Sequence, residues 1–451
     1  MASTTHIKDF TKGNITDQLL HFAWPLFLSN LLQVFYNMAD MIIVGHVHGK
    51  AGTSAVAVGG DISMLLTFVA MGFGSAGQVI IAKYIGRGKK DDLGKFVGTM
   101  AGFLGISAVV ISILGLFFQN QLLKLMNTPS EAYKGAVAYS TICMVGLIFI
   151  YGYNAVSAIL RGMGDSKHPF IFIGIAAGLN VVLDILFVGI IGTGVGGAAL
   201  ATVISQGVSF ISCTVFLIKN HTKFSLNCKI TDFVRLDKEM LTDLLKLGIP
   251  MAIKMAAVQI SKLFVNSYVN SYGVEVSAFA GIANKLASFS NLISNSMNAA
   301  GSTMVGQNIA AGKFERVRKI ILRVAAITLT VSATVSVIYT VFPEVIVGLF
   351  TNDSTVTALA KPFIPIAVLL FFSSAMRAMM NALINGSGNY GTNFATAILD
   401  GIVLRIGLSV LFGLVLDMKH LGFWLGDALA GYTPFFIGLV FYLSGAWKKQ
   451  R

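Results

Sequence analysis

Long apolar segments separated by short polar stretches make up most of the chain. A helix needs about 20 consecutive apolar residues to cross the hydrocarbon core of a bilayer. Twelve segments reach this length, and they are residues 17–45, 54–82, 95–119, 133–160, 168–190, 194–219, 240–272, 277–310, 319–342, 357–385, 393–417 and 420–447. The pattern predicts an all-α polytopic membrane protein with twelve transmembrane helices.

The pattern contains an internal repeat. Three pairs of similar segments lie nearly half a chain apart: Leu19–Pro25 with Leu244–Pro250, Gly77–Lys89 with Gly301–Lys313, and Arg161–Asp165 with Asn385–Asn389. A duplicated membrane unit is typical of transporters, whose substrate path lies where the repeats meet. We therefore expect an N-terminal six-helix lobe over 1–219, a cytoplasmic linker over 220–239 and a C-terminal six-helix lobe over 240–451. Because each lobe has an even number of spans, a pseudo-two-fold axis along the membrane normal should relate them.

Composition and charge support a membrane protein. Of the 451 residues, 55% are hydrophobic and 12% charged, with a mean hydropathy of +0.76, which excludes a soluble globular domain. If the N-terminus is cytoplasmic, the inner loops and tails hold about 22 of the 33 Lys and Arg residues. This bias predicts a multi-pass protein of the inner or plasma membrane with both termini in the cytoplasm. The net charge of +13 then reflects orientation and attraction to anionic lipid, and no nucleic-acid partner is expected.

Two carboxylates of the first lobe fall inside predicted spans. Asp40 and Asp184 each lie about 8–9 Å inside the outer boundary, as counted from the rise of an α-helix per residue. Thr202 lies slightly deeper, and one helical turn separates Asn180 from Asp184 and Tyr36 from Asp40. Ionisable groups in hydrocarbon are costly and usually functional. These five side chains are predicted to bind H⁺ or Na⁺; Na⁺ would use Asp40, Asn180, Asp184 and Thr202, and no cofactor is expected.

The second lobe carries basic groups instead. Its predicted spans contain Lys254, Lys262, Arg377 and Arg405, together with Asp400. One interpretation is that these cations pair with Asp400, with carbonyl groups or with lipid headgroups, and Arg405 fits it well. Lys254 lies too deep to reach the headgroups, so we expect it to face an aqueous cavity.

The predicted substrate cavity takes one carboxylate from the first lobe. Asp61 lies at a depth comparable with Asp40 and joins Lys254, Lys262 and Arg377 in this prediction, although Gly59 and Gly60 precede it and make it a weaker candidate. No HExxH, GxSxG or Walker motif occurs, so we expect no enzyme activity.

Several motifs together resemble the multidrug and toxic compound extrusion (MATE) family over essentially the whole chain. They are Pro25 with Ala39–Asp40, Arg161–Lys167, Asn180–Asp184, Gly197–Thr202 and Gln307–Gly312. The resemblance implies two lobes forming a V around a central cavity, and export by antiport against H⁺ or Na⁺ with rocking between inward-open and outward-open states. The chain looks most like the DNA-damage-inducible branch, whose cation site falls on Asp40, Asn180, Asp184 and Thr202, with Tyr36 nearby.

Departures from the family pattern bear on coupling and on the substrate. Branches that couple through the second lobe have a carboxylate in the seventh helix, where this chain has Val258 and Gln259, and Ser373–Ser374 replaces an acidic position of the tenth. Two cavity lysines would repel organic cations, so zwitterionic, anionic or larger amphipathic substrates are expected. The alternative is a flippase of a lipid-linked precursor from the same wider superfamily. Either protein is expected to act as a monomer in contact with membrane lipid.

Overall fold

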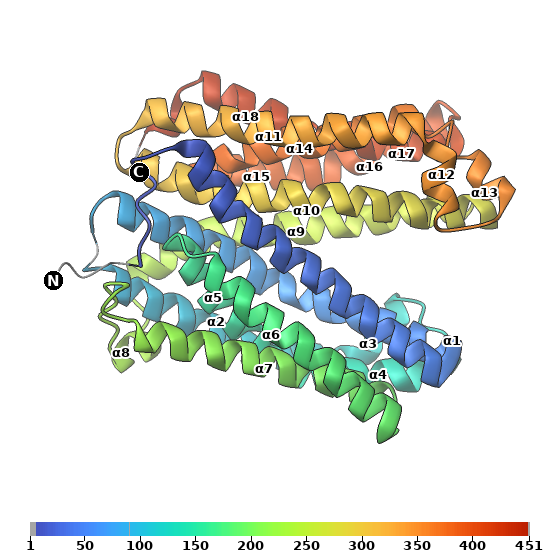
Figure 1. The fold of residues 1–451 in the computed structure, drawn as a ribbon, viewed down its shortest axis with the longest axis horizontal. Helices are drawn as coiled ribbons and strands as arrows, with labels where there is room; N and C mark the ends of the chain where they lie inside the picture. The colour runs from blue at the N-terminus through green and yellow to red at the C-terminus, as the bar shows by residue number, and fades with distance from the viewer. Residues whose placement is uncertain (1–5, 90, 450–451) are drawn as a thin grey trace. The chain divides into compact units, whose positions relative to one another are not determined.

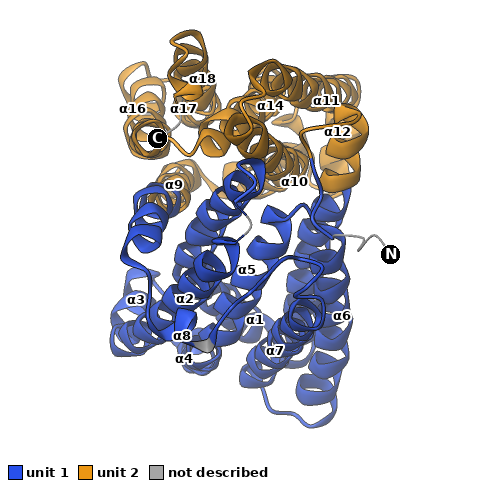
Figure 2. Ribbon diagram, turned by 90° about the vertical axis from the view of Figure 1, so that its left-hand side faces the viewer, with its two compact units in different colours: residues 1–9, 24–252 blue, residues 10–23, 253–451 orange. Residues whose placement is uncertain are grey.

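The computed structural model describes residues 6–89 and 91–449, which form a helical protein (Figure 1). It divides into two compact units, shown in different colours in Figure 2. Unit 1 holds the described residues up to Asp9 and Trp24–Ala252. Its helices are most of α1 (Ile15–Gly86), α2 (Leu93–Phe117), α3 (Gln119–Leu125), α4 (Ser130–Val145), α5 (Leu147–Gly162), α6 (Lys167–Asp184), the π-helix η1 (Ile185–Ile190), α7 (Val195–Lys219), α8 (Ile230–Val234) and the first part of α9 (Lys238–Asn270).

Unit 2 holds Phe10–Ala23 and the chain from Ile253 onwards. After the rest of α9 come α10 (Val274–Ala310), α11 (Phe314–Val341), α12 (Pro343–Gly348), α13 (Ser354–Ala358), α14 (Ile364–Ser387), α15 (Tyr390–Ile398), the π-helix η2 (Leu399–Val403), α16 (Leu404–Val410), the π-helix η3 (Leu411–Val415), α17 (Lys419–Ala430), α18 (Thr433–Leu443) and the 3-10 turn η4 (Ala446–Lys448). The lobe boundaries expected from membrane topology, at 219 and 240, stay a prediction, because the compact units reflect packing.

Every predicted span corresponds to helix. Within the described residues, nine helices are long and apolar enough to cross a membrane, or ten if the bent pair α4 and α5 is one span. α1 contains two of the predicted spans because the chain bends sharply at Gly49, and α10 covers the span predicted at 277–310. The tenth predicted span begins later than expected, at Ile364 and not at 357. Pro362 explains the difference, because it lacks an N–H and clashes with the carbonyl four residues earlier.

The duplication is visible in the backbone. Five of the first-half positions with a positive φ have a counterpart nearly half a chain later that also has one: Gly49 with Gly273, Gly88 with Gly312, Gly164 with Gly388, Gly192 with Asp417, and Gly194 with Lys419. Two of the counterparts are not glycine, so the second copy adopts this conformation at a cost in strain. The repeats therefore share turn geometry even where their residues differ.

The polar segment before α1 is held by the Gln307–Gly312 motif at the end of α10. Phe10 is 1% exposed, and its N–H donates to Oε1 of Gln307 at 2.9 Å. Its carbonyl accepts from Nδ2 of Asn308 at 3.1 Å and from Nε of Arg316 at 2.9 Å. The chain leaves unit 2 for unit 1 between Ala23 and Trp24, inside α1. Gln307 and Asn308 thus have a structural role in fastening the start of the chain.

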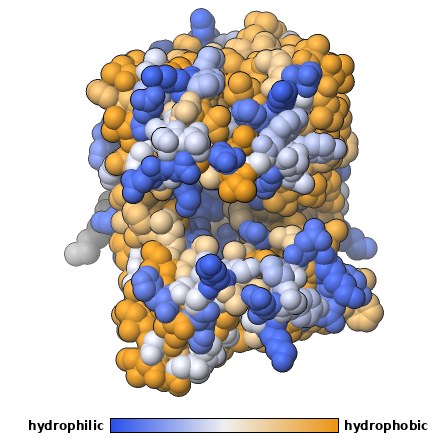
Figure 3. Space-filling view, turned by 90° about the vertical axis from the view of Figure 1, so that its right-hand side faces the viewer, coloured by the Kyte–Doolittle hydropathy of each residue, from blue (hydrophilic) through white to orange (hydrophobic). Residues whose placement is uncertain are grey.

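Hydrophobic side chains cover the flanks of the helices. Figure 3 looks onto one end of the helices and shows polar side chains over that end and apolar side chains around the sides. Large apolar residues on several spans are well exposed, such as Trp24, Ile113, Phe117, Val182 and Val440. In a bilayer these surfaces contact lipid, so the exposure of large apolar side chains agrees with a multi-pass membrane protein.

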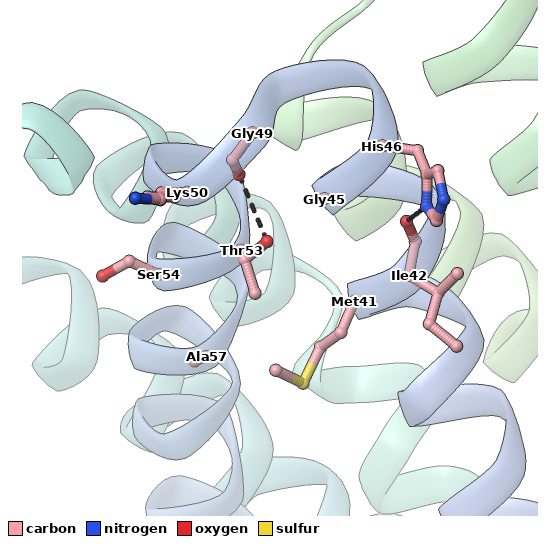
Figure 4. Close-up of a pocket in the computed structure, with 9 residues that line it drawn as sticks. All are labelled: Met41, Ile42, Gly45, His46, Gly49, Lys50, Thr53, Ser54 and Ala57. Carbon is pink, nitrogen blue, oxygen red and sulfur yellow. Dashed lines mark hydrogen bonds between the residues drawn. The ribbon is translucent and has the colours of Figure 1, made fainter. Parts of the chain in front are cut away.

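A surface pocket of about 700 Å³ lies at the bend of α1 (Figure 4). Gly49 forms the bend with φ 61° and ψ −153°, and its carbonyl accepts from Oγ1 of Thr53 at 3.2 Å. Nδ1 of His46 bonds to the carbonyl of Ile42 at 2.8 Å, on the opposite side of the pocket. The side chains of Thr53 and His46 are thus engaged in local helix bonds.

Candidate cation-binding site

Three helices of unit 1 bring together four side chains that the sequence predicts to lie at a similar depth in the membrane. α1 supplies Asp40, α6 supplies Asn180 and Asp184 one turn apart, and α7 supplies Thr202. The α-helical part of α6 ends at Asp184, where the π-helix η1 begins. Such π segments are rare, and they often occur at functional sites.

A chain of hydrogen bonds leads to one carboxylate. Nδ2 of Asn180 donates to Oγ1 of Thr202 at 3.4 Å, and Oγ1 of Thr202 donates to Oδ2 of Asp40 at 3.2 Å. The carboxyl groups of Asp40 and Asp184 lie close enough to interact directly. Asp40 is 2% exposed and Asp184 0%, so the two acidic groups share one buried site.

The site has fewer hydrogen-bond donors than its carboxylate and amide oxygens require. Among the described residues, none donates a hydrogen bond to Oδ1 of Asp40, to either oxygen of Asp184 or to Oδ1 of Asn180. Leaving a buried polar group without a partner costs about 1–3 kcal/mol, and more if it is charged. A proton shared by the carboxyls, or a cation bound by these oxygens, would remove that cost.

Two further polar side chains at this site were not predicted from the sequence. Nε2 of Gln206 donates to the hydroxyl of Tyr36 at 3.5 Å, and Tyr139 of α4 interacts with both Thr202 and Asp40. Gln206 follows Thr202 by one helical turn, so its spacing was a usable signal. Nothing in the sequence around Tyr139 pointed to the site, because its contact depends on how α4 packs against α7.

The predicted members of the substrate cavity have different surroundings. Asp61 is exposed on unit 1 and is not part of the acidic cluster. In unit 2, Nζ of Lys254 donates to Oδ1 of Asn381 at 2.7 Å, and Nη2 of Arg377 donates to Oδ1 of Asn291, also at 2.7 Å. Neither cation has a carboxylate within ion-pair distance among the residues that the structure describes.

Arg405 forms a buried ion triad, which confirms the expected pairing with Asp400 and adds a second partner. Its Nη2 lies 2.8 Å from Oδ1 of Asp400, and its Nη1 donates to Oδ1 of Asp427. Arg405 is 1% exposed and Asp400 0%. A buried pair of this kind persists only when each charge is compensated. The triad therefore uses the two carboxylates of unit 2 that lie near its basic residues.

The first-lobe cluster has the chemistry of a site for a hard cation. Carboxylate, amide and hydroxyl oxygens suit Na⁺ or a proton, and they are not the sulfur and imidazole ligands that transition metals select. Within the described residues, no group of three or more His, Cys, Asp or Glu side chains could hold a metal ion. The cluster has only two carboxylates, so a bound Na⁺ would also need the neutral oxygens of Asn180 and Thr202.

Comparison with known proteins decides the family. The MatE family model matches residues 25–186 and again residues 250–411. This chain belongs to the MatE family. The two matches have equal length, and their starts at residues 25 and 250 lie close to half a chain apart. The family unit is therefore the repeat seen in the sequence and in the backbone.

Multidrug transporters are similar to this MatE protein over nearly its whole length. A probable multidrug resistance protein of Bacillus subtilis, YpnP, is 28% identical over 445 residues, covering 98% of each chain. The multidrug export protein MepA of Staphylococcus aureus is 23% identical over 414 residues, covering 90% of each chain. These relatives place the protein in a family of multidrug efflux transporters.

Solved structures agree with the fold. A multidrug resistance MATE family transporter in an outward-facing conformation superposes with a TM-score of 0.89 at 23% identity, covering 98% of both chains. A transporter of the MOP superfamily from Pyrococcus furiosus, described as having a binding pocket of reverse polarity, gives a TM-score of 0.88 at 23% identity and the same coverage. The fold of two six-helix lobes is thus that of MATE transporters.

Proposed function

We propose that this protein exports amphipathic small molecules by antiport with H⁺ or Na⁺, and that the first-lobe cluster binds the coupling ion. The observation that carries the proposal is the set of buried oxygens on Asp40, Asn180 and Asp184 that receive no hydrogen bond among the described residues. A mobile cation can satisfy them, and its departure leaves charged carboxylates in a medium of low dielectric. Binding and release therefore change the free energy of the first lobe by several kcal/mol, which suffices to bias a conformational equilibrium.

Each polar group has a distinct part in this proposal. Asp40 and Asp184 carry the charge that the ion neutralises, and Thr202 orients Asp40 by its hydrogen bond. Asn180 holds the hydroxyl of Thr202 and offers its free Oδ1 as a ligand. Tyr36, fixed by Gln206, borders the carboxylates. Alternating access between the two lobes would couple ion entry to substrate release.

The protein would act as a monomer in the cell membrane, with both termini in the cytoplasm and in contact with lipid. Lys254, Lys262, Arg377 and Asp61 would face the substrate. Assignment to the DNA-damage-inducible branch rests on the sequence motifs alone.

Transport in proteoliposomes tests the proposal directly. A pH gradient and a Na⁺ gradient are imposed separately, and substrate movement is measured with wild type, Asp40→Asn and Asp184→Asn. We expect one gradient to drive transport in wild type, and both variants to lose it, because Asn keeps the volume but cannot carry the charge. Glu131→Gln is the control, since Glu131 is an exposed carboxylate at the start of α4. Gradient-driven transport at the wild-type rate by either variant would remove that residue from the coupling site.

A further inference from the structure

The second lobe contains a small cavity lined by basic side chains. It has a volume of about 30 Å³ and lies among helices α9, α10, α14, α16 and α17 of unit 2. Its charged lining consists of Lys262, Arg377, Arg405 and Asp427. Asn291 and Asn284 contribute amide groups to the same wall. The cavity belongs to one lobe and is separate from the first-lobe carboxylates.

The charges around this cavity do not balance. Four cations occur in this part of the lobe, Lys254, Lys262, Arg377 and Arg405, against the two carboxylates of Asp400 and Asp427. Arg405 engages both carboxylates in the triad. Lys262 and Arg377 therefore form no ion pair of their own among the described residues, and they are attracted at longer range by a triad in which one guanidinium faces two carboxylates. Two positive charges in excess inside a membrane lobe call for an anion.

Donors are also available at the cavity wall. Oδ1 of Asn291 accepts from Arg377 at 2.7 Å and from Oγ of Ser374 at 3.0 Å. The amide is thereby oriented so that its NH₂ group remains a donor. For Nζ of Lys262, no hydrogen bond or ion pair is found among the residues that the structure describes. An ammonium, a guanidinium and an amide NH₂ thus lie at one small cavity, where the charged acceptor is the carboxylate of Asp427, which already accepts from Arg405 through Oδ1.

We propose that the second lobe binds a compact monovalent anionic group between Lys262, Arg377 and Asn291. The cavity volume is close to the share of one water in the liquid, which limits the ligand to a single small group. A free halide and the carboxylate of a substrate have the required charge and size. The proposal gives an anionic ligand to Lys262 and Arg377, two of the groups proposed above to face the substrate, and in the case of a substrate carboxylate it rests on that function. Anion binding in this lobe needs no gradient and no first-lobe ion, so it can be tested apart from antiport.

Thermal unfolding of the purified full-length protein in detergent tests the proposal. Sodium chloride, sodium acetate and sodium gluconate are compared at one pH and one sodium concentration, so that the first-lobe cluster experiences constant conditions. Gluconate is too large for the cavity and serves as the reference. We expect chloride or acetate to raise the Tm of wild type saturably by a few degrees, because a ligand that binds only the folded state stabilises it.

Variants locate the effect. Lys262→Gln and Arg377→Gln should raise the anion concentration for half-maximal stabilisation at least tenfold. Lys285→Gln is the matched control, since Lys285 lies on α10 next to Asn284 but is exposed and does not line the cavity. Ala287→Leu tests the volume without changing the charge, because Ala287 lines the cavity and a larger side chain would fill it. If Lys262→Gln and Arg377→Gln do not fold, the response of Ala287→Leu to the anions tests the proposal.

The outcomes are distinct. Stabilisation by chloride but not by acetate identifies a free halide, and stabilisation by acetate at equal or lower concentration identifies a carboxylate. The proposal is overturned if wild type melts alike in all three salts. It is also overturned if Ala287→Leu keeps the full response, or if Lys285→Gln loses as much of it as Lys262→Gln, which would indicate general surface charge.

Discussion

The two lobes place different chemistry at equivalent positions. When the two family matches are aligned from their starts at residues 25 and 250, Asn180 corresponds to Arg405, and the same offset carried past the ends of the matches pairs Thr202 with Asp427. In the first lobe the amide donates to the hydroxyl, and in the second the guanidinium donates to the carboxylate. Neither oxygen of Asp184 has a donor among the described residues, whereas Asp400 and Asp427 each have one oxygen bound by Arg405, although Oδ2 of Asp400 is also buried without a donor.

The backbone around these positions has been kept. The π-helix η1 begins at Ile185 in the first lobe, and η3 begins at Leu411 in the second, next to the equivalent position. Asp184 corresponds to Ser409, so the second lobe lacks that carboxylate and receives Asp400 from η2 instead. If the first lobe binds the coupling ion as proposed, one helical framework holds an exchangeable cation in the first lobe and the permanent cation of Arg405 in the second. Only the exchangeable kind can couple to a gradient.

Removing the guanidinium of Arg405 should have the largest effect on the free energy of unfolding. Arg405→Gln removes the guanidinium that is hydrogen-bonded to buried Asp400 and to half-buried Asp427, and we expect it to lower the free energy of unfolding by about 3–5 kcal/mol. An SDS titration in mixed micelles would measure the change. Adding Asp400→Asn and Asp427→Asn to the same variant should recover much of the loss. A loss as small as that of Arg323→Gln, which removes an exposed guanidinium of the same lobe, would contradict the triad's importance.

The first-lobe carboxylate should respond in the opposite direction. Asp184→Asn removes a buried charge and adds an NH₂ group that can donate to Asp40, so we expect a gain of about 1–2 kcal/mol in the absence of the coupling ion. The same titration measures it, with Glu131→Gln as the control. A destabilisation comparable with that of Arg405→Gln would mean that Asp184 is compensated within the lobe, and the contrast between the lobes would fail.

A smaller effect is expected at the hydroxyl that orients Asp40. Thr202→Val keeps the shape and removes the 3.2 Å hydrogen bond to Oδ2 of Asp40, which is worth about 1 kcal/mol. The concentration of coupling ion for half-maximal transport should rise about fivefold. Ser205→Ala on the same helix is the control, because Oγ of Ser205 is buried without a hydrogen-bond partner among the described residues. Equal shifts in both variants would indicate a general effect on α7.

An exposed ion pair provides the lower limit for these effects. Nζ of Lys95 lies 2.7 Å from Oδ2 of Asp237, and the bonds from Lys95 and from the N–H of Met240 lower the pKa of Asp237. A lowered pKa stabilises the fold above the unfolded value of about 3.9 and loses that contribution as the pH falls through the folded value. The Tm of Asp237→Asn should therefore lie slightly below wild type by a constant amount from pH 7 to pH 5, and the difference should vanish at lower pH. A drop at pH 7 as large as that of Arg405→Gln would contradict the distinction between exposed and buried pairs.

Much of the candidate site followed from the sequence because depth in a membrane can be counted along a helix. Asp40 and Asp184 each lie a known number of residues from a turn, and the constant rise of an α-helix converts that number into a shared layer. Asn180 and Tyr36 followed from the one-turn spacing. Asp427 and Tyr139 did not, because their roles depend on contacts with helices distant in sequence. For the same reason, the sequence predicted one of the two partners of Arg405. Asp400, about one turn before Arg405, was predicted, and Asp427, on the next long helix, was missed.

The sequence by itself determined the twelve spans and the duplication. It also showed that the spans of the first lobe carry acidic groups and those of the second lobe mainly basic ones. Bilayer thickness fixes the length of an apolar helix, and an unpaired charge in hydrocarbon is too costly to occur by chance. Only the tertiary structure decided which charges are compensated. It assigned both acidic groups near Arg405 to that one guanidinium, left Lys262 and Arg377 in excess, and left the oxygens of Asp184 without donors among the described residues. Compensation depends on side-chain atoms meeting within about 3 Å, and helix packing sets those distances.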